Sequence, residues 1–371
     1  MRTGYDEVVL LTGFPSFRAR RMCEELLAAP GRALVHAVVH AKLEDDARAA
    51  LDAMPLEARR RVEITLGDAA AMDLGLSGAE FRSLTSEVDR IHHCVQVNYL
   101  GADRAAAELV NVGAAREILE FARACKRLRC LVVHSSASVS GDRSGVVYER
   151  ELDCGQKFRN VVEETLARAE RIVRRAMNDV PIAVLRPSIV VGDSRTGEID
   201  RLEGPYLLIL LMLAAPPDFA LPLPARSDVA LNMVPIDYVT KAALHIGRDE
   251  RAIGRTFHLV DPAPLPPRRV FELVARAGGR RVPTGFLPAN LTRALLRAPG
   301  LERIAQSPRA FLEAMVLPVT YDASAAEELL QDTDIRCPPF ESYVERLVEH
   351  VQKWLDARVS KRETEQYDPL G

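Results

Sequence analysis

Hydrophobic and polar residues follow two distinct periods through the first half of the chain. Short runs of aliphatic and β-branched residues, typical of buried strands, occupy residues 8–11, 34–39, 62–66, 90–94, 130–134 and 182–185. Between them, apolar residues recur at helical spacing in residues 22–29, 46–54, 105–125 and 158–177. Strands that alternate with amphipathic helices predict an α/β fold with a doubly wound parallel sheet.

The pattern changes after Arg186. Residues 193–230 are rich in proline, a strand-like run returns at residues 256–260, and helical segments joined by proline-rich connections follow from Pro262. We expect a sheet domain made of residues 1–192 and 231–261, and a smaller, mostly helical substrate or cap domain made of residues 193–230 and 262–358. The last segment, residues 359–371, is charged and aperiodic, which predicts a disordered tail.

Charge and composition exclude several classes of protein. The net charge of -3 and the pI near 6.3 offer no basic surface for nucleic acid. The six cysteines form no CxxC pair, and the adjacent His92 and His93 point to opposite faces of one strand, one buried and one exposed, so no metal site is expected. The longest apolar run, residues 206–215, is too short for a membrane span of about 20 residues. Without an apolar leader before the first strand, we expect a cytoplasmic protein.

The first strand runs into residues 12–17, in the place of a glycine-rich loop that binds a dinucleotide. Such a loop uses one glycine for a tight turn, a second so that the backbone reaches the pyrophosphate, and a third for close helix packing. Only the first, Gly13, is present, because Ser16 and Ala19 occupy the other two positions. The Ser16 side chain weakens the backbone approach, although its hydroxyl can donate to a phosphate. A Thr-Gly pair after a strand is also consistent with an ordinary strand-to-helix turn.

Two further segments fit the adenosine half of a dinucleotide. Gly67 and Asp68 follow the third strand-like run, where this architecture places an acid beside the adenine. His40 and Lys42 follow the second run, where an NAD-binding protein carries an acidic residue. A cation there suits the 2'-phosphate of NADP, whereas a solvated surface charge explains Lys42 equally well.

Together these segments resemble the extended short-chain dehydrogenase/reductases, which include the NAD-dependent epimerases and dehydratases. Within that superfamily the chain is most similar to the thioester reductase and fatty acyl reductase-like branch, and the resemblance extends from about residue 7 to about residue 355. It implies a Rossmann-type fold and NADP or NAD as the cofactor. The segments that carry it are residues 12–15, 67–68, 110–112, 135–136, 155–156, 185–194 and 234–238.

The resemblance also implies the residues of the site. The family acts through a Ser or Thr, a Tyr and a Lys, and its serine falls on Ser136, at the end of the fifth strand-like run. Its tyrosine and lysine fall on Val162 and Leu166. The cofactor site that the resemblance implies comprises Thr12, Gly13, Phe14, Ser16, Phe17, His40, Lys42, Asp68, Cys94, Val95, Pro187, Ser188 and Ile189.

Valine and leucine cannot perform the family's proton transfer. In that mechanism the tyrosine protonates the carbonyl oxygen while a hydride reaches the carbon, and the lysine lowers the tyrosine pKa from about 10 and binds the nicotinamide ribose. Loss of a positioned general acid costs about 10² to 10⁴ in rate. Val162 and Leu166 instead continue an apolar helical stripe through Ala169 and Val173, which favours a packing role.

Four other residues are alternative proton donors near these positions. Tyr148 and Lys157 precede the helix, but their spacing does not place them on one helix face. Tyr99 and His134 are the other two. Ser136 is itself consistent with a serine that only satisfies backbone groups at a strand end.

Two functions remain open on this basis. The first is a catalytically impaired reductase relative, a pseudoenzyme that acts as a nucleotide- or ligand-binding regulatory or scaffold protein, with cofactor binding weakened or lost. The second is an NADP-dependent oxidoreductase that reduces carbonyl, thioester or acyl substrates with an unorthodox proton donor. Both leave open a small-molecule or acyl ligand, a protein partner, and a homodimer through residues 105–125 and 158–177. The apolar run 206–213 is consistent with an acyl pocket or with a buried helix.

Overall fold

The computed structural model describes residues 4–99, 101–214, 229–282 and 318–366. The chain divides into two compact units. Unit 1 comprises Met1–Ser188, Asp237–Val260 and Val319–Arg336. Unit 2 comprises Ile189–Ile236, Asp261–Pro318 and Cys337–Gly371.

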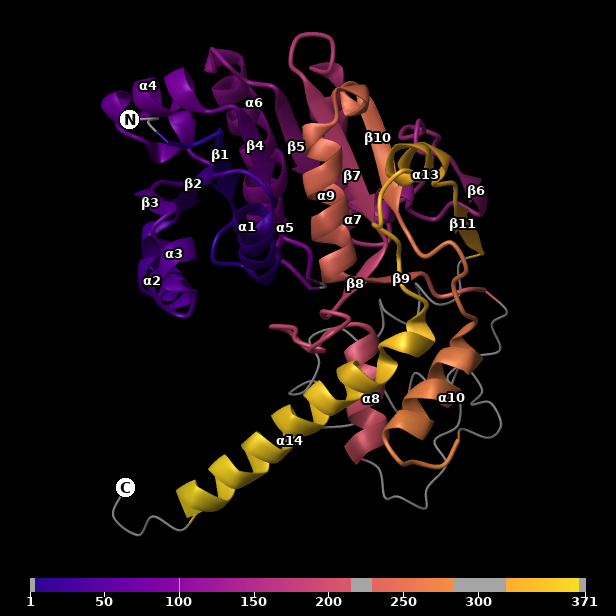
Figure 1. Cartoon of the computed structure of the whole chain (residues 1–371). Coiled ribbons are helices and arrows are strands. Elements are labelled where there is room, and N and C mark those ends of the chain that lie inside the picture. Colours follow the sequence, from indigo (N-terminus) through magenta and orange to yellow (C-terminus); the bar gives the residue numbers. More distant parts are fainter. Residues whose placement is uncertain (1–3, 100, 215–228, 283–317, 367–371) are drawn as a thin grey trace. The chain divides into compact units, whose positions relative to one another are not determined.

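Unit 1 is built on a seven-stranded parallel sheet with the order β10-β7-β5-β4-β1-β2-β3 (Figure 1). The strand order reverses between β1 and β4, and such a switch point is where α/β sheets bind ligands. The α/β fold with a doubly wound parallel sheet is therefore confirmed. The strands are β1 (Glu7–Thr12), β2 (Ala33–Val39), β3 (Val62–Leu66), β4 (Arg90–His93), β5 (Cys130–His134), β7 (Ile182–Pro187) and β10 (Arg255–Leu259).

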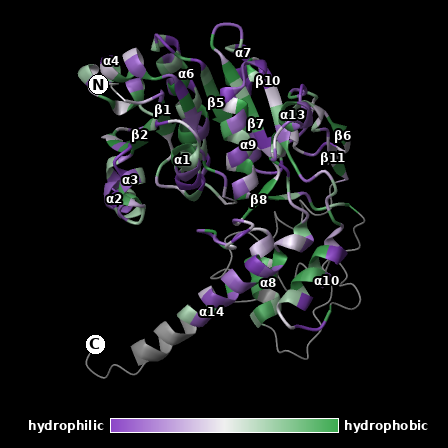
Figure 2. Cartoon of the chain, viewed as in Figure 1, coloured by the Kyte–Doolittle hydropathy of each residue, from purple (hydrophilic) through white to green (hydrophobic). Residues whose placement is uncertain are grey.

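Helices cover both faces of this sheet. On one face, buried residues of β1, β4, β5 and β7 form one apolar cluster with α4, α6 and α7. On the other face, Gly247 of α9 lies against Val132 of β5, where an added Cβ would meet the valine at 2.7 Å. Figure 2 accordingly shows mainly hydrophobic strands between helices that carry polar positions. The unit 1 helices are α1 (Phe17–Ala28), η1 (Ala41–Leu43), α2 (Glu44–Asp52), α3 (Leu56–Arg59), η2 (Met72–Gly75), α4 (Gly78–Glu87), α5 (Arg104–Ala107), η3 (Glu108–Gly113), α6 (Ala114–Ala124), η4 (Ala137–Ser140), α7 (Val161–Arg175), α9 (Ile236–Arg248), η5 (Glu250–Ala252) and α13 (Ser324–Leu330).

The predicted helix over residues 105–125 consists of three consecutive segments. An α-helical turn, α5, leads into the π-helical segment η3, and α6 completes the run. The hydrophobic period does not reveal this, because a π turn shifts the register of the helix face by one residue without breaking its amphipathic character. The shift places Asn111 inside the sheet domain, where it is 3 % exposed.

The two compact units differ from the expected domain boundaries, since residues 189–192 and 231–236 lie in unit 2. Residues 319–336 belong to unit 1, because β11 (Val319–Tyr321) pairs with β6 (Gly145–Val147) and α13 packs against β10. The predicted tail is helical as far as Gln366, since the helix α14 (Val344–Gln366) continues through a segment without glycine or proline. Residues 367–371 lie outside the described residues.

Among its described residues, unit 2 has an apolar core of its own, to which three helices contribute. Buried residues of α8 (Pro205–Ala214), α10 (Pro267–Ala277) and α14 pack together with β8 (Ile189–Val191) and β9 (Met233–Pro235), which pair in parallel. The aromatic rings of Phe340, in the short helix η6 (Phe340–Ser342), and Tyr343 meet edge to face with centroids 5.3 Å apart. Aliphatic and aromatic packing thus holds this unit together.

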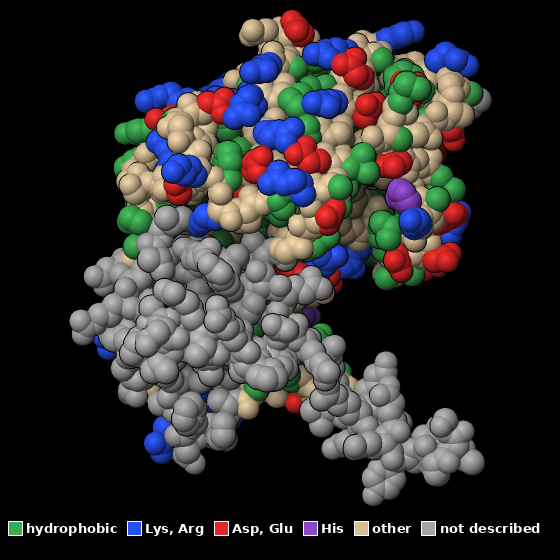
Figure 3. Space-filling view, turned by 180° about the vertical axis from the view of Figure 1, so that it is seen from behind, with side chains coloured by type: hydrophobic (Ala, Val, Ile, Leu, Met, Phe, Trp, Pro, Cys, Tyr) green, Lys and Arg blue, Asp and Glu red, His purple; other side chains and the backbone are tan. Residues whose placement is uncertain are grey.

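The surface of the described residues mixes both signs of charge. In the view of Figure 3, blue and red side chains are interspersed over unit 1. Many of them form ion pairs, such as Arg104 with Glu164 at 3.0 Å and Arg255 with Glu328 at 2.7 Å. Within the described part of the chain, no helix combines the length and apolarity that a membrane crossing requires.

Candidate functional site

The turn after β1 approaches the chain that follows β4 so closely that only glycine fits. Gly13 has a φ of +90°, and a Cβ there would lie 2.9 Å from both the carbonyl carbon of Cys94 and the amide nitrogen of Val95. A positive φ together with backbone contact excludes other residues without strain. The backbone at the β1–β4 switch point therefore has the tight turn that a dinucleotide loop requires.

Most other side chains of this loop point into the protein. Phe14 and Phe17 are buried, and the buried Thr12 hydroxyl lies 2.9 Å from Nδ1 of His93. Ser16 is exposed and precedes α1 as its N-cap, but its side chain makes no capping hydrogen bond. The Ser16 hydroxyl is thus the loop side chain placed to meet a ligand.

The ends of β2 and β3 carry the predicted adenosine contacts. His40 and Lys42 are exposed, and the His40 Nδ1 accepts a hydrogen bond of 3.1 Å from the Lys42 amide. This bond caps η1 and leaves the Lys42 ammonium in solvent. The Asp68 carboxylate accepts a 2.9 Å hydrogen bond from the Ala70 amide, and Gly67 is required because a Cβ would lie 2.5 Å from the Leu74 carbonyl. The cofactor roles of these residues stay predictions.

Two residues that the sequence analysis missed, Arg18 and Gln96, meet beside the end of β4. Burial raises the pKa of the Cys94 thiol to about 12, so Cys94 is an inert packing residue. With its side-chain amide in the orientation that satisfies both its oxygen and its nitrogen, Gln96 accepts a hydrogen bond from the Arg18 guanidinium and donates one of 3.1 Å to the His134 carbonyl. Arg18 lies in the first turn of α1, so these hydrogen bonds join α1 to the ends of β4 and β5. A charged residue immediately before Ala19, the third loop position, was the available signal.

Three neighbouring histidines are buried in the sheet. His92 and His93 are 0 % and 4 % exposed, which corrects the expectation that one of them faces solvent; the reason is that helices cover both faces of the sheet. Burial lowers the pKa of His92 to about 3 and that of His93 to about 4, so both are neutral near pH 7. The His92 Nδ1 lies 3.5 Å from the His134 Nε2. Within the described ranges, no group of three or more His, Cys, Asp or Glu side chains could hold a metal ion.

The serine pair after β5 is engaged in local and long-range structure. The Ser136 hydroxyl accepts a 3.2 Å hydrogen bond from the Ser138 amide and lies 2.9 Å from the Ser138 hydroxyl, so it caps η4. Ser135 donates a 2.7 Å hydrogen bond to Glu170, which also pairs with Arg186 deep in the core. The arginine of the Leu-Arg-Pro segment is therefore a structural residue, held by a carboxylate from α7.

Val162 and Leu166 lie in an apolar cluster on α7. Each is 5 % exposed, and the cluster contains Val97 from the β4–α5 connection and Val139 from η4. Partly buried residues, Tyr99 among them, pack against it. The expected packing role of these two positions agrees with the structure.

The π-helical segment η3 supplies a further residue that the sequence analysis did not weigh as a site residue. The Asn111 side chain accepts a 2.7 Å hydrogen bond from the Val97 amide and donates bonds to the Val97 carbonyl and to the Thr165 hydroxyl, at 3.0 and 2.9 Å. Thr165 immediately precedes Leu166 on α7. Asn111 thus joins η3 to α7 through Thr165, next to the apolar Leu166.

The alternative proton donors lie in different environments. Tyr148 is exposed beneath the Arg150 guanidinium, 4.6 Å from its ring centroid, and Lys157 is also exposed. His134 is buried, and burial with neighbouring positive charge holds its pKa well below the ordinary value. Among the four, Tyr99 is the residue that packs against the Val162 and Leu166 cluster.

The remaining predicted cofactor residues lie at the C-terminal end of β7 and directly after it. Pro187 is buried, and the Ser188 amide donates a 3.1 Å hydrogen bond to the Leu259 carbonyl. The buried Ser188 hydroxyl has no hydrogen-bond partner among the described residues. Ile189 begins β8 and belongs to unit 2. The contacts of Pro187, Ser188 and Ile189 with a cofactor stay predictions.

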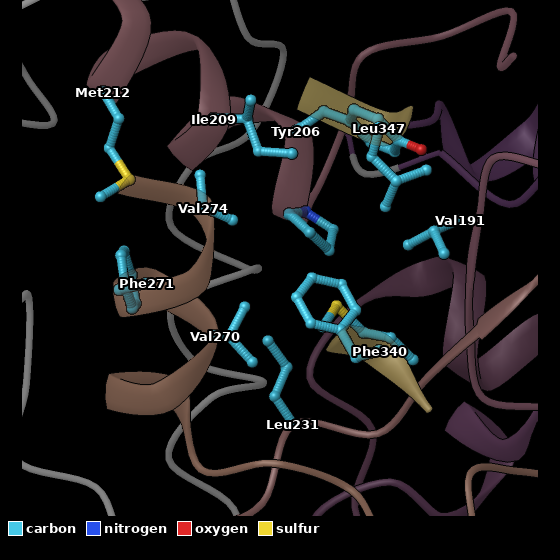
Figure 4. Close-up of a pocket in the computed structure, with 12 residues that line it drawn as sticks. Val191, Tyr206, Ile209, Met212, Leu231, Val270, Phe271, Val274, Phe340 and Leu347 are labelled. Atoms are coloured by element: carbon cyan, nitrogen blue, oxygen red, sulfur yellow. The ribbon is translucent and has the colours of Figure 1, made fainter. Parts of the chain in front are cut away.

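Unit 2 contains an apolar pocket within its core. In Figure 4, side chains such as Val270, Phe340 and Leu231 line it from several elements. Tyr206, Ile209 and Met212 of α8 contribute to the same lining. The apolar run 206–213 therefore forms a buried helix that also lines a pocket.

The loop, the sheet order and the Arg-Pro segment agree with one family. The model of the male sterility protein family matches residues 11–243, which is more than half of the chain. The chain belongs to this family. It is thereby an extended short-chain dehydrogenase/reductase of the thioester reductase-like branch, as the sequence predicts.

The curated relatives that match are mostly much longer proteins. One of the subunits of linear gramicidin synthase from Brevibacillus parabrevis is 27% identical over 271 residues, which are 69% of this chain and 5% of that protein. Glycine betaine reductase ATRR from Emericella nidulans is 27% identical over 72% of this chain and 22% of its own length. Fatty acyl-CoA reductase wat from Drosophila melanogaster is 25% identical over 55% of this chain and 47% of its own length. The chain thus spans less than half the length of each of these three.

Solved structures share the whole fold. The terminal R domain from the myxalamid PKS-NRPS biosynthetic pathway has a TM-score of 0.79 at 24% identity, covering 95% of this chain and 92% of that one. Yeast methylglyoxal/isovaleraldehyde reductase Gre2, complexed with NADPH, has a TM-score of 0.67 at 14% identity, covering 94% and 99%. At these identities the likeness concerns the fold, which is that of reductase domains.

Proposed function

We propose that this chain binds a nicotinamide dinucleotide but has lost efficient hydride transfer, and that it acts as a ligand-binding regulatory or scaffold protein. The observation that carries the proposal is the buried apolar cluster around Val162 and Leu166, each 5 % exposed. Neither side chain can donate a proton or carry a charge, and their packing also excludes water that could take over the role. A buried hydrocarbon surface at the family's proton-transfer position therefore favours binding without turnover.

The residues present fit a dinucleotide. Gly13 keeps the tight turn at the switch point, and the exposed Ser16 hydroxyl before α1 can donate to a phosphate, which supports binding that is weakened rather than abolished. The exposed His40 and Lys42 at the end of β2 suit the 2'-phosphate of NADP better than the ribose hydroxyl of NAD. When bound, the cofactor would supply the hydride chemistry of the family. This chain's own residues would hold its phosphates and leave proton transfer without a donor.

A second candidate is an NADP-dependent oxidoreductase with Tyr99 as its proton donor. The specific observation is that Tyr99 packs against the cluster that contains Val162 and Leu166. Leu166 stands where the family's activating lysine is expected, so a phenol at Tyr99 would act without that lysine and turnover would be slow at neutral pH. Tyr99→Phe separates this candidate from the first.

The ligand and the cellular setting follow from two further observations. The pocket of unit 2 is lined by aliphatic and aromatic residues, which suits an acyl chain or another apolar small molecule. Cys23, Cys94, Cys125, Cys130 and Cys154 carry free thiols, which suits the reducing environment of the cytoplasm. The proposal also includes a homodimer that forms through α6 and α7. It further includes a protein partner for the regulatory or scaffold role.

Cofactor titration combined with a turnover assay tests the proposal. The purified chain would be titrated with NADPH and NADH by fluorescence, then assayed with aldehydes and acyl thioesters. Binding of NADPH without consumption supports the first function. Turnover that Tyr99→Phe abolishes supports the second and sinks the first, whereas Tyr148→Phe serves as the matched tyrosine control. Absence of binding to either nucleotide contradicts both.

A further inference from the structure

Arg18 places a positive charge at the β1–β4 switch point, in a loop position where this architecture does not require one. It lies in the first turn of α1, and its side chain reaches Gln96, which follows β4. Through Gln96 it connects to the His134 carbonyl at the end of β5. Arg18 therefore spans the edge of the sheet where ligands of α/β proteins bind.

The charge of Arg18 is poorly compensated by the protein. The side chain is partly buried, and burial lowers its pKa from the ordinary value, although an arginine remains protonated at neutral pH. Among the residues that the structure describes, no carboxylate pairs with it, and its hydrogen-bond acceptor is the neutral amide of Gln96. By comparison, the buried Arg186 is neutralised by Glu170 and the buried Arg90 by Glu7. A desolvated cation without a counter-charge is costly, and an anion supplied by a ligand would offset that cost.

The nearby backbone has the shape of an anion site. Gly13 packs against Cys94 and Val95, which leaves no side chain between the loop and the end of β4. The exposed Ser16 hydroxyl makes no capping hydrogen bond. A planar guanidinium with several donors matches phosphate oxygens in two-point contacts, which a lysine or a backbone amide alone does not.

We propose that Arg18 is the specificity-determining residue of this site and holds a phosphate group of the bound ligand, in place of the backbone approach that a second loop glycine would allow. The inference rests on the proposed nucleotide binding and deepens it. The ligand phosphate comes from a dinucleotide pyrophosphate or from a free phosphate compound.

Arg18→Met in the full chain tests this assignment. The thermal midpoint would be measured without ligand, with NADPH and with inorganic pyrophosphate, and the Kd of each would be titrated. We expect Arg18→Met to raise the midpoint without ligand, because a desolvated charge disappears, and to weaken NADPH binding about 10- to 100-fold. Arg18→Lys keeps the charge but not the planar fork, so it should bind with intermediate affinity. Arg21→Met, on the same helix and paired with Glu24 at 2.7 Å, is the control and should leave the NADPH Kd unchanged.

Each outcome decides between the alternatives. If Arg18→Met lowers the thermal midpoint and leaves the NADPH Kd unchanged, Arg18 only stabilises the fold through its hydrogen bond with Gln96. In that case the inference fails, whereas the proposed nucleotide binding stands. If the unmodified chain binds pyrophosphate through Arg18 but not NADPH, the phosphate site stands and the proposed nucleotide function fails. If it binds neither, both are overturned.

Discussion

The loop after β1 and the buried face of α7 belong to the same unit, yet they differ from the family's pattern in opposite ways. In the loop, Gly13 remains because its backbone contacts Cys94 and Val95 directly. On α7, Val162 and Leu166 belong to a buried apolar cluster, at the positions where the resemblance places the family's tyrosine and lysine. We propose that features set by the backbone are kept, whereas features that require a side chain's chemistry are replaced by packing.

The difference also separates stability from chemistry. The loop glycine is required by the fold itself, since any Cβ would collide with the neighbouring chain. Val162 and Leu166, in contrast, contribute aliphatic packing to the cluster on α7. Asn111 and Thr165 combine the two kinds of feature, because a hydrogen bond between their side chains joins η3 to α7 and so supports the fold.

Restoring the two side chains is the strongest challenge to this comparison. Val162→Tyr with Leu166→Lys should raise NADPH-dependent reduction of an aldehyde by about 10² to 10⁴, because a general acid and its activating cation return to a scaffold that is intact. Steady-state absorbance of NADPH measures the rate. Val162→Tyr alone is the control, and we expect it to recover far less, since its phenol lacks the lysine. A double variant that folds, binds NADPH and remains inactive would show that more than the pair has been lost.

Substitution of Gly13 tests the backbone side of the comparison. Gly13→Ala should lower the free energy of unfolding by about 2 to 4 kcal/mol, because the Cβ meets backbone and the φ is positive. Gly254, with a φ of +78° and no atom within 4 Å of an added Cβ, is a matched control. Gly254→Ala should cost only about 1 kcal/mol of strain. Urea unfolding of both variants gives the values, and equal losses would contradict the close approach at the switch point.

His93, which is buried beside Thr12 at the start of the loop, should make the stability of this region depend on pH. Burial lowers the pKa of His93 from 6.5 to about 4, so protonation favours the unfolded chain. The stability that neutral His93 contributes is complete above pH 6.5 and is lost as the pH falls toward 4, with a slope of at most about 1.4 kcal/mol per pH unit. His93→Leu should therefore flatten the pH dependence of the unfolding free energy between pH 6.5 and 4. His40→Leu, at an exposed histidine, should leave the slope as it is; a similar flattening there would refute the assignment.

The smallest effect, a change in the preference for NADP over NAD, is expected at Lys42 in η1. Lys42→Ala should reduce the preference for NADP over NAD about two- to five-fold, because an exposed cation contributes little through screening solvent. Competitive titration of the two nucleotides at low and high salt measures the ratio. Lys126→Ala, at an exposed lysine that precedes β5, is the control. No change in the Lys42 variant would mean that Lys42 is a solvated surface charge.

Several features of the site were accessible from sequence because they depend on local pattern. The strand and helix periods predicted the sheet, and the single glycine after the first strand predicted the tight turn at Gly13. The helical stripe through Val162 and Leu166 predicted that both positions pack, which their burial agrees with. In each case the residues concerned are close in sequence, so their spacing carries the information.

Other features depended on contacts between distant segments. Arg18 and Gln96 lie on different elements, and nothing in the spacing of either predicts that they meet. The pairing of β11 with β6 moved residues 319–336 into unit 1, since strand pairing follows the fold and not the chain order. One of His92 and His93 was expected to be exposed, and coverage of both sheet faces placed both in the core.

The sequence by itself determined the class of fold, the family, and the absence of the tyrosine and lysine at the positions that the resemblance implies. The fold class follows from the spacing of hydrophobic residues, and the other two follow from residue identity, and both can be read without the structure. Only the tertiary structure decided what fills the place of those two residues and which charge stands at the switch point. Burial, close approach and the pairing of charges are properties of segments brought together by folding. For this reason the sequence could name the missing chemistry, whereas the packed cluster on α7 and the uncompensated Arg18 emerged from the three-dimensional arrangement.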